Sequence, residues 1–197
     1  MSTKAKIAMT VLFAMGLVML VIMPGIARDK YETIDATAYG TSTQMGQNIG
    51  VTLIIYEYST PDDRQILVEA FQKGQSQGLV NALSKMKAVG RMSIQGTLGS
   101  DVAFIKMIPT STGRKIRFIT NRQIRFGEAW ADSQSMSYNL TAGELDINSA
   151  DKSKSAGTLY PAAQLILNKE GEPQWELNQN PWRLGGIIDW KGTPGEN

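Results

Sequence analysis

Two residue types are absent from this sequence: its 197 residues contain no cysteine and no histidine. Without cysteine the chain forms no disulfide, so the burial of apolar side chains must supply its stability. The two absences together exclude Ser-His-Asp and Cys-His catalysis, thiolate nucleophiles and nearly all protein zinc or copper sites. Chemistry by carboxylates, lysine, serine, threonine or tyrosine stays open, and we expect no metal site and no cofactor.

An uncharged and strongly apolar run lies at the N-terminus. Lys4 and Lys6 precede the apolar segment 7–23, "IAMTVLFAMGLVMLVIM", and "PGIA" follows it before Arg28. A basic start, an apolar stretch and a small residue at Ala27 are typical of an export signal, here residues 1–27. The run is slightly short for a membrane span of roughly 20 residues, so an uncleaved anchor is the alternative. We expect a periplasmic or extracellular protein that contacts the membrane only if this segment is retained.

Charge is balanced in the rest of the chain. The sequence has 20 basic and 18 acidic residues, and the predicted signal contains two of the lysines and no acid. The remaining segment 28–197 has the length of a single domain and would carry no net charge. A neutral protein has no global field with which to attract nucleic acid, so we expect no nucleic-acid partner.

One helical block is expected early in this domain. Thr60 can cap a helix, Pro61 suits its first position, and two aspartates follow where the helix dipole favours negative charge. Apolar residues then repeat at helical spacing on both sides of the segment "KGQSQG". This pattern predicts a pair of short helices near residues 61–89.

Alternating apolar residues predict strands in most of the remaining sequence. The segments "DVAFIKMIP" and "RKIRFITNRQIRF" flank the turn "TSTG" and form a predicted hairpin. In "SMSYNLTAGELDIN" the parity of the apolar residues changes beside Gly143, which indicates a β-bulge or a bend. Pro161 predicts that the segment "TLYPAAQLILNK" is an edge strand. We expect an α+β fold, with a largely antiparallel sheet of about seven to nine strands, in a barrel or a sandwich, and the helical pair inserted.

Five segments carry a resemblance to known sequences: "YSTPDDRQILVEAF", "LSKMKAVGRM", "TGRKIRFITNR", "FGEAW" and "NPWRLGGIIDW". In combination they resemble a group of uncharacterised exported bacterial proteins with no assigned activity. The resemblance covers most of the domain, from about residue 36 to residue 190. It implies export and a bacterial source, and it transfers no reaction, ligand or site residue.

Five basic residues lie close together in the sequence: Arg114, Lys115, Arg117, Arg122 and Arg125. One interpretation is a groove for an anionic polysaccharide, a lipid headgroup or nucleic acid, with Arg117 and Arg122 as binding candidates. The alternative is the solvated face of an amphipathic strand, because most of these residues alternate with apolar ones. Arg122 instead shares the apolar parity, which suggests a buried or interfacial ion pair with Glu128 or Asp132.

Three of the four tryptophans lie near the C-terminus, at Trp175, Trp182 and Trp190. Parity places the last two on one face of a strand together with Ile188, which is typical of a strand that closes a core. Gly185 and Gly186 lie between them and allow a bend. The alternative is a ligand site at a rim, for which the binding candidates are Trp130, Trp175, Trp182 and Arg183.

Carboxylates are the remaining candidates for catalysis. Glu144 and Asp146 share a parity in an extended strand, where they could act as an acid/base pair on a glycan, although ordinary surface acids are commoner. The sequence therefore favours an exported, non-enzymatic binding or surface-assembly domain, whose partner is a glycan, a lipid headgroup or another envelope protein. The alternatives are a carboxylate-dependent hydrolase or lyase acting on a glycan, and a structural subunit that associates by strand addition.

Overall fold

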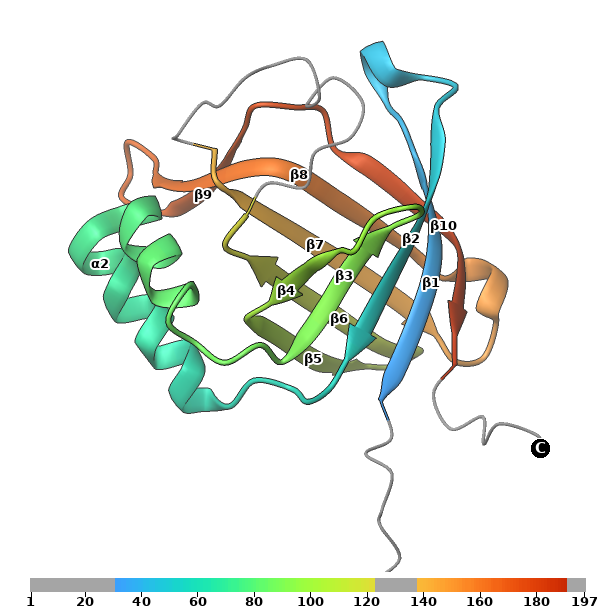
Figure 1. Cartoon of the computed structure of the whole chain (residues 1–197), viewed down its shortest axis with the longest axis horizontal. Helices are drawn as coiled ribbons and strands as arrows, with labels where there is room; N and C mark the ends of the chain where they lie inside the picture. Colours follow the sequence, from blue (N-terminus) through green and yellow to red (C-terminus); the bar gives the residue numbers. More distant parts are fainter. Residues whose placement is uncertain (1–30, 123–137, 191–197) are drawn as a thin grey trace, which may run out of the picture. The chain divides into compact units, whose positions relative to one another are not determined.

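Antiparallel strands follow one another around a nearly closed barrel in the computed structural model (Figure 1). The structure describes residues 31–122 and 138–190. Within these ranges one α-helix, α2 (Pro61–Leu83), accompanies the strands. The strands in chain order are β1 (Glu32–Tyr39), β2 (Asn48–Ile55), β3 (Gly90–Ile94), β4 (Ser100–Val102), β5 (Phe104–Thr110), β6 (Gly113–Thr120), β7 (Leu140–Asn148), β8 (Ala156–Leu167), β9 (Pro173–Leu177) and β10 (Trp182–Asp189).

The strand order explains how the sheet curls into a barrel. Neighbouring strands run β4-β3-β2-β1-β10-β8-β7-β6-β5, all pairs are antiparallel, and β9 pairs with β8 beside this path. The two ends of the path, β4 and β5, are consecutive in the chain with only Ala103 between them. The predicted largely antiparallel sheet is therefore confirmed, as a nearly closed barrel, and the fold is consistent with α+β but mostly β. The predicted hairpin is β5–β6.

The main core fills the interior of the barrel. Side chains that alternate along the strands point inward and are almost fully buried, since successive residues of a strand face opposite sides of the sheet. Full burial of one such side chain stabilises the fold by about 1.5–3 kcal/mol. The largest of these buried side chains are Trp182, Ile34, Met92, Ile105, Ile116, Leu145 and Leu159.

A capping box starts helix α2 where the sequence predicted a helix. The Thr60 hydroxyl accepts a hydrogen bond from the Asp63 backbone N–H at 3.2 Å, and the Asp63 carboxylate accepts one from the Thr60 backbone N–H at 2.7 Å. Gly74 and Gln75 leave the helical conformation, so the predicted pair of helices appears as two segments of one element. The helical structure ends at Leu83 rather than near residue 89.

The helix buries its apolar side chains in a second, smaller cluster on the outside of the sheet. Leu67, Leu79 and Leu83 of α2 pack there with Phe104 of β5 and Leu140 of β7. Because Phe104 lies opposite Ile119 and Ile119 lies opposite Ala142, this outer face is apolar at one end of the strands. The sheet is therefore covered on both sides at that end and on one side elsewhere.

The bulge or bend predicted in β7 beside Gly143 does not occur. The β6–β7 ladder runs without a shift from Thr120↔Thr141 to Gly113↔Asn148, so β7 is regular at that glycine. The parity of the apolar residues changes because Leu140 is buried on the outer face and Leu145 on the inner one. Packing explains the glycine at position 143 instead, because an added Cβ would lie 2.3 Å from the Phe118 ring.

Strand β8 is central, so the prediction of an edge strand at Pro161 was wrong. It pairs with β7 on one side, and with β10 and then β9 on the other. The β7 pairing shifts between Tyr160 and Ala163, where β8 has one residue more than β7. Pro161 lies in this bulge, and a bulge tolerates proline because that position needs no ladder N–H.

A second bulge, in β10, changes the predicted parity of the C-terminal strand. Asp35↔Ile188 and Thr37↔Gly185 are register partners, so β10 has one extra residue between these pairs. Gly186 supplies the positive φ of 58° in this bulge. Trp182 points inward as expected, but Ile188 and Trp190 are 49% and 47% exposed. The prediction that all three share a buried face was therefore wrong.

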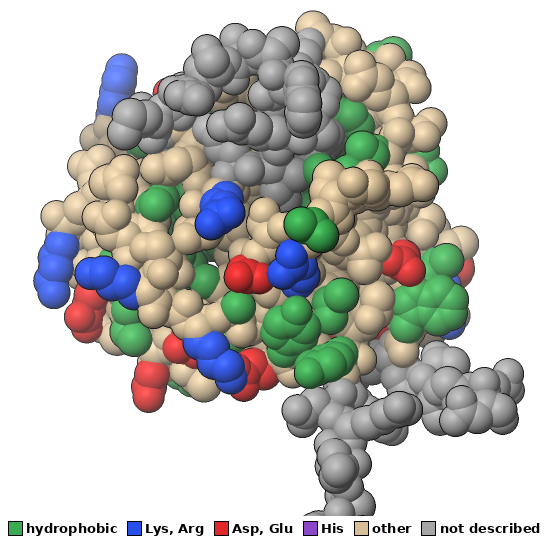
Figure 2. Space-filling model, viewed as in Figure 1, with side chains coloured by type: hydrophobic (Ala, Val, Ile, Leu, Met, Phe, Trp, Pro, Cys, Tyr) green, Lys and Arg blue, Asp and Glu red, His purple; other side chains and the backbone are tan. Residues whose placement is uncertain are grey.

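Charged side chains of both signs are interspersed over the face of the molecule in Figure 2. Blue and red groups alternate there, with hydrophobic side chains in green between them, and neither sign covers a large continuous area of that face. Local arrangements of charge, rather than a global field, must then decide where a charged ligand could bind.

Candidate functional site

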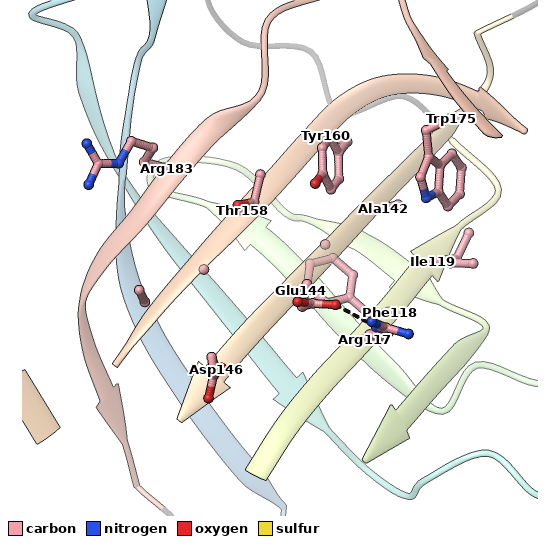
Figure 3. A pocket seen from close by; sticks show the side chains of 13 residues that line it. Arg117, Phe118, Ile119, Ala142, Glu144, Asp146, Thr158, Tyr160, Trp175 and Arg183 are labelled. Carbon is pink, nitrogen blue, oxygen red and sulfur yellow. Dashed lines mark hydrogen bonds and ion pairs between the residues drawn. The ribbon is translucent and has the colours of Figure 1, made fainter. Parts of the chain in front are cut away.

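The outer face of β6, β7, β8 and β10 carries a groove of about 740 Å³ (Figure 3). Its walls combine charged, hydroxyl and aromatic side chains that come from segments far apart in the sequence. We call it the outer groove. Its main side chains are Arg117 and Ile119 of β6, Glu144 and Asp146 of β7, Thr158 and Tyr160 of β8, Trp175 of β9 and Arg183 of β10.

Strand register brings the polar side chains of the outer groove into one row. Arg117 is the register partner of Glu144, Glu144 that of Thr158, and Thr158 that of Arg183. Partners in adjacent strands point to the same side of a sheet, and neighbouring strands lie about 5 Å apart. The four side chains therefore cross the outer face of the barrel side by side, from β6 to β10.

Aromatic side chains form another part of the outer groove. Tyr160 is half-buried and lies in register with Ala142, next to the polar row. Trp175 is also half-buried, because one side of it packs against the cluster under α2. In the view of Figure 3 the rings of Tyr160 and Trp175 lie toward one side, and Arg183, at the end of the polar row, lies toward the other. The outer groove thus joins an aromatic part to a polar part.

Two cations hold the carboxylate of Glu144. Lys115 Nζ lies 2.7 Å from one of its oxygens and Arg117 Nε lies 2.5 Å from the other. Partial burial alone would raise the pKa of Glu144, but the hydrogen bonds from Lys115 and Arg117 outweigh it and lower this pKa below its usual value. Lys115 also lies 4.0 Å from Asp146. Glu144 is therefore ionised at neutral pH and holds no proton for a general acid to donate.

Arg183 differs from the other cations of the outer groove because it is exposed and unpaired within the described part of the chain. Arg117 and Lys115 each contact Glu144, so their charge is already offset. A guanidinium presents five N–H donors, which suit carboxylate and phosphate oxygens. Arg183 is therefore the group of the outer groove best placed to receive an anion from solution.

The tryptophan candidates separate in the structure. Trp175 lines the outer groove, whereas Trp182 is 2% exposed and lies in the barrel core. Trp182 thus takes the position that its strand parity favoured over a rim site. Trp130 lies outside the described residues. No platform of several tryptophans forms among residues 31–122 and 138–190.

Arg117 and Arg183 line the outer groove, and Arg122 does not. Arg122 follows the end of β6, is exposed, and borders a smaller polar depression of about 340 Å³ together with Arg91 and Asp101. Arg122 is therefore not buried, and an interfacial ion pair stays a prediction. Its suggested partners, residues 128 and 132, lie outside the described residues.

Thr158 and Tyr160 belong to the outer groove, although the sequence pattern did not single them out. Both alternate with inward-facing residues such as Leu159, so their outward orientation was readable from parity. Parity could not predict that they lie near Glu144, because this proximity depends on the register between β7 and β8.

A second group of charged side chains lies inside the barrel, at the end where β1 begins. Arg114 donates hydrogen bonds to the carboxylates of Glu32 and Asp189, the latter at 2.6 Å. It also donates to the Tyr58 hydroxyl at 2.9 Å, and this hydroxyl donates to Glu32 at 2.8 Å. We call these four residues the Arg114 cluster. Its charged side chains are only 8–18% exposed, so the cluster forms part of the barrel interior.

Burial and pairing change the acidity of this interior cluster. Burial, followed by the hydrogen bond to Glu32, raises the pKa of the Tyr58 phenol well above its usual value. Burial would lower the pKa of the Arg114 guanidinium, but hydrogen bonds to Glu32 and Asp189 outweigh burial and raise it. Tyr58 is therefore a neutral donor and Arg114 a permanent cation.

In residues 31–122 and 138–190, acidic side chains do not gather in groups of three or more that could hold a metal ion. Within the same ranges, no helix is both long and apolar enough to cross a membrane.

Comparisons with known proteins give no match. No protein-family model matches the chain, and neither a curated protein nor a solved structure matches it. The resemblance to exported bacterial proteins therefore stays a prediction. The outer groove is interpreted from its own geometry.

Proposed function

We propose that the protein is an exported, non-enzymatic binding domain, and that the outer groove holds a polar ligand with an acidic group, such as an acidic glycan. The proposal depends above all on one observation: Arg183 is exposed and unpaired among the described residues, in a groove that also contains Tyr160 and Trp175. Ligand sites typically combine aromatic surface with a few converging polar groups. Export rests on the sequence of residues 1–27.

The chemistry of the groove fits an acidic glycan in two ways. The rings of Tyr160 and Trp175 offer flat apolar surface with a polar edge, which suits the face of a sugar ring. Arg183 offers paired N–H donors to a carboxylate or a sulfate, and the Thr158 hydroxyl beside it can donate or accept. A neutral glycan would use the first feature and leave the second unused.

Binding is tested by probing an array of neutral and acidic glycans with the full-length chain and titrating each hit by calorimetry. We expect an acidic glycan to bind, and Arg183→Ala to weaken it about tenfold or more, because a hydrogen bond to a charged group contributes about 1.5–3 kcal/mol. Arg64→Ala is the matched control, since Arg64 is an exposed arginine on α2. Affinity that is equal in both variants would contradict the proposal.

A carboxylate-dependent hydrolase is the second candidate, because Glu144 and Asp146 both line the outer groove. The lowered pKa of Glu144 excludes it as the general acid, so in such a pair it could act only as the ionised carboxylate. Glu144→Gln distinguishes the two candidates. We expect this substitution to preserve or tighten binding of the acidic glycan, because it removes a like charge. In a hydrolase the same substitution would abolish release of reducing ends while the wild-type chain produces them.

A further inference from the structure

Exposed apolar side chains gather at one end of the barrel, where β1 begins and where β2 and β10 end. Figure 2 shows hydrophobic side chains in green near the lower edge of the described surface, in the region of these strand ends. We call the group the aromatic patch. Its members, with their exposed fractions, are Tyr31 (58%), Tyr56 (40%), Ile188 (49%) and Trp190 (47%).

Strand register places these four side chains on one surface. Glu32 pairs with Ile55, so the preceding Tyr31 lies beside Tyr56, and their rings meet edge to face at a centroid distance of 5.1 Å. Asp35 pairs with Ile188, and the Trp190 backbone N–H donates to the Thr33 carbonyl at 2.9 Å. The patch therefore extends across β10, β1 and β2 on the outer side of the barrel. The β10 bulge creates it by turning Ile188 and Trp190 outward.

The polar atoms around the aromatic patch are held in place. The indole N–H of Trp190 donates to the Asp35 carboxylate at 2.8 Å, and the Thr52 hydroxyl donates to the same carboxylate at 2.6 Å. The Trp190 ring is thus fixed at its N–H edge and exposed elsewhere. The ring is therefore already oriented for an interface at which its apolar face meets an apolar surface and its N–H edge stays near water.

Two ion pairs lie beside the aromatic patch, and the Asp35 carboxylate within it is held by its hydrogen bonds from Trp190 and Thr52. Lys87 Nζ lies 2.8 Å from Glu57, which follows Tyr56, and Arg91 lies 3.2 Å from Asp101 on the strands next to β2. Neither pair leaves an uncompensated charge at the edge of the patch. A partner of this surface is then recognised by its apolar character rather than by its net charge.

The sequence in front of the patch points to one partner. The apolar segment 7–23 ends before residue 24, and only seven residues, 24–30, separate it from Tyr31. Seven residues span at most about 25 Å when extended, so a membrane that holds segment 7–23 lies within reach of the patch. Tyrosine and tryptophan favour the interface between lipid headgroups and acyl chains, because their rings are apolar and their tips polar.

We propose that residues 1–27 are retained as a membrane anchor, the alternative to cleavage, and that the aromatic patch docks on the headgroup region of the bilayer that holds this segment. Docking orients the barrel on the membrane through the ring faces of Tyr31, Tyr56 and Trp190. It depends on partition of aromatic rings, so zwitterionic phosphatidylcholine suffices and salt has little effect. This inference does not depend on the ligand of the outer groove.

The absence of cysteine makes a clean test possible, because one introduced cysteine carries a single label. Ile188→Cys and Leu98→Cys are labelled with an environment-sensitive fluorophore in the full-length chain and reconstituted into phosphatidylcholine vesicles. Leu98 is the matched control: it is 89% exposed and lies in the turn after β3, at the opposite end of the β2–β3 pair from Tyr56. Quenching by bromine on the lipid acyl chains is measured, and quenching by aqueous iodide is measured in parallel.

Support for docking requires a difference between the two sites. We expect the label at residue 188 to be quenched by brominated lipid at least threefold more than the label at residue 98, with no change in high salt. When Tyr31→Ser and Trp190→Ser are added, we expect aqueous iodide to quench the label at residue 188. Circular dichroism checks that this variant is folded. Equal quenching by iodide at both sites overturns the proposal. Protection of residue 188 from both quenchers also overturns it, because protein and not lipid would then cover the patch.

Discussion

The Arg114 cluster and the outer groove use the same types of charged side chain in two different surroundings. Inside the barrel, Arg114 binds Glu32 and Asp189, and all three side chains are at most 18% exposed. On the outer face, Arg117 binds Glu144, and these two side chains are 56% and 33% exposed. The first group is shielded from water by the barrel, and the second group is open to any ligand that enters the groove.

This difference determines what each group can contribute. Removing one partner of a buried ion pair leaves an unpaired charge that water does not solvate, whereas an exposed pair is screened and contributes little to stability. The Arg114 cluster is therefore expected to hold four segments of the barrel together. The charges of the outer groove are free to exchange a protein partner for a ligand at small cost.

The comparison is tested most strongly by Arg114→Met. We expect the free energy of unfolding to fall by about 3–5 kcal/mol, because Glu32 and Asp189 lose the guanidinium that neutralises them inside the barrel. Urea denaturation at neutral pH measures the change. Arg117→Met is the matched substitution in the outer groove, and we expect it to cost less than about 1 kcal/mol. Similar losses in both variants would mean that burial does not separate the two groups.

Tyr58→Phe gives a smaller expected effect within the same cluster. The variant removes a hydroxyl that donates to Glu32 and accepts from Arg114, and each partner is charged. We expect a loss of about 1.5 kcal/mol in the free energy of unfolding. Because the pKa of Tyr58 is raised, the variant should also lack the last step of the tyrosinate absorbance titration. Loss of absorbance in the usual tyrosine range instead would place Tyr58 outside the cluster.

Glu144→Gln has the smallest expected effect and tests the outer groove by its pH dependence. A carboxyl group with a lowered pKa stabilises the fold above its ordinary value of about 4.3, and this contribution is lost as pH falls through the lower, folded-state value. We expect wild type to exceed the variant by under about 1 kcal/mol at pH 7, and the difference to shrink below about pH 4. Urea denaturation at several pH values measures it. A difference that grows as pH falls would indicate a protonated Glu144 and support the hydrolase.

Local patterns predicted the elements of this fold well and predicted the strand neighbours less well. The cap at Thr60, the break at Gly74 and the β5–β6 hairpin follow from residues close in sequence. The edge position predicted for Pro161 failed because a bulge can hold a proline in a central strand. The parity predicted for Trp190 failed because Gly186 supports an extra residue in β10.

In the candidate site too, the orientation of single side chains was predictable from local sequence, and their arrangement relative to one another was not. Arg117 and Arg183 face outward because each alternates with buried residues, and that orientation needs no knowledge of neighbouring strands. Their arrangement in one row with Glu144 and Thr158 depends on register across four strands. Register is set by bulges and by contacts between segments far apart in the chain, which a local pattern does not contain.

The sequence alone determined the absence of thiol and imidazole chemistry, the alternation that forms the strands, and the helix start at Thr60. Tertiary structure decided which charges are buried. Arg114 and Arg117 are three residues apart in one strand, so they point to opposite faces of the sheet. Only closure of the barrel made one of those faces an interior lined by Glu32 and Asp189 and the other a groove open to water. The physical reason is that side-chain direction is local, whereas solvent exclusion requires the whole sheet.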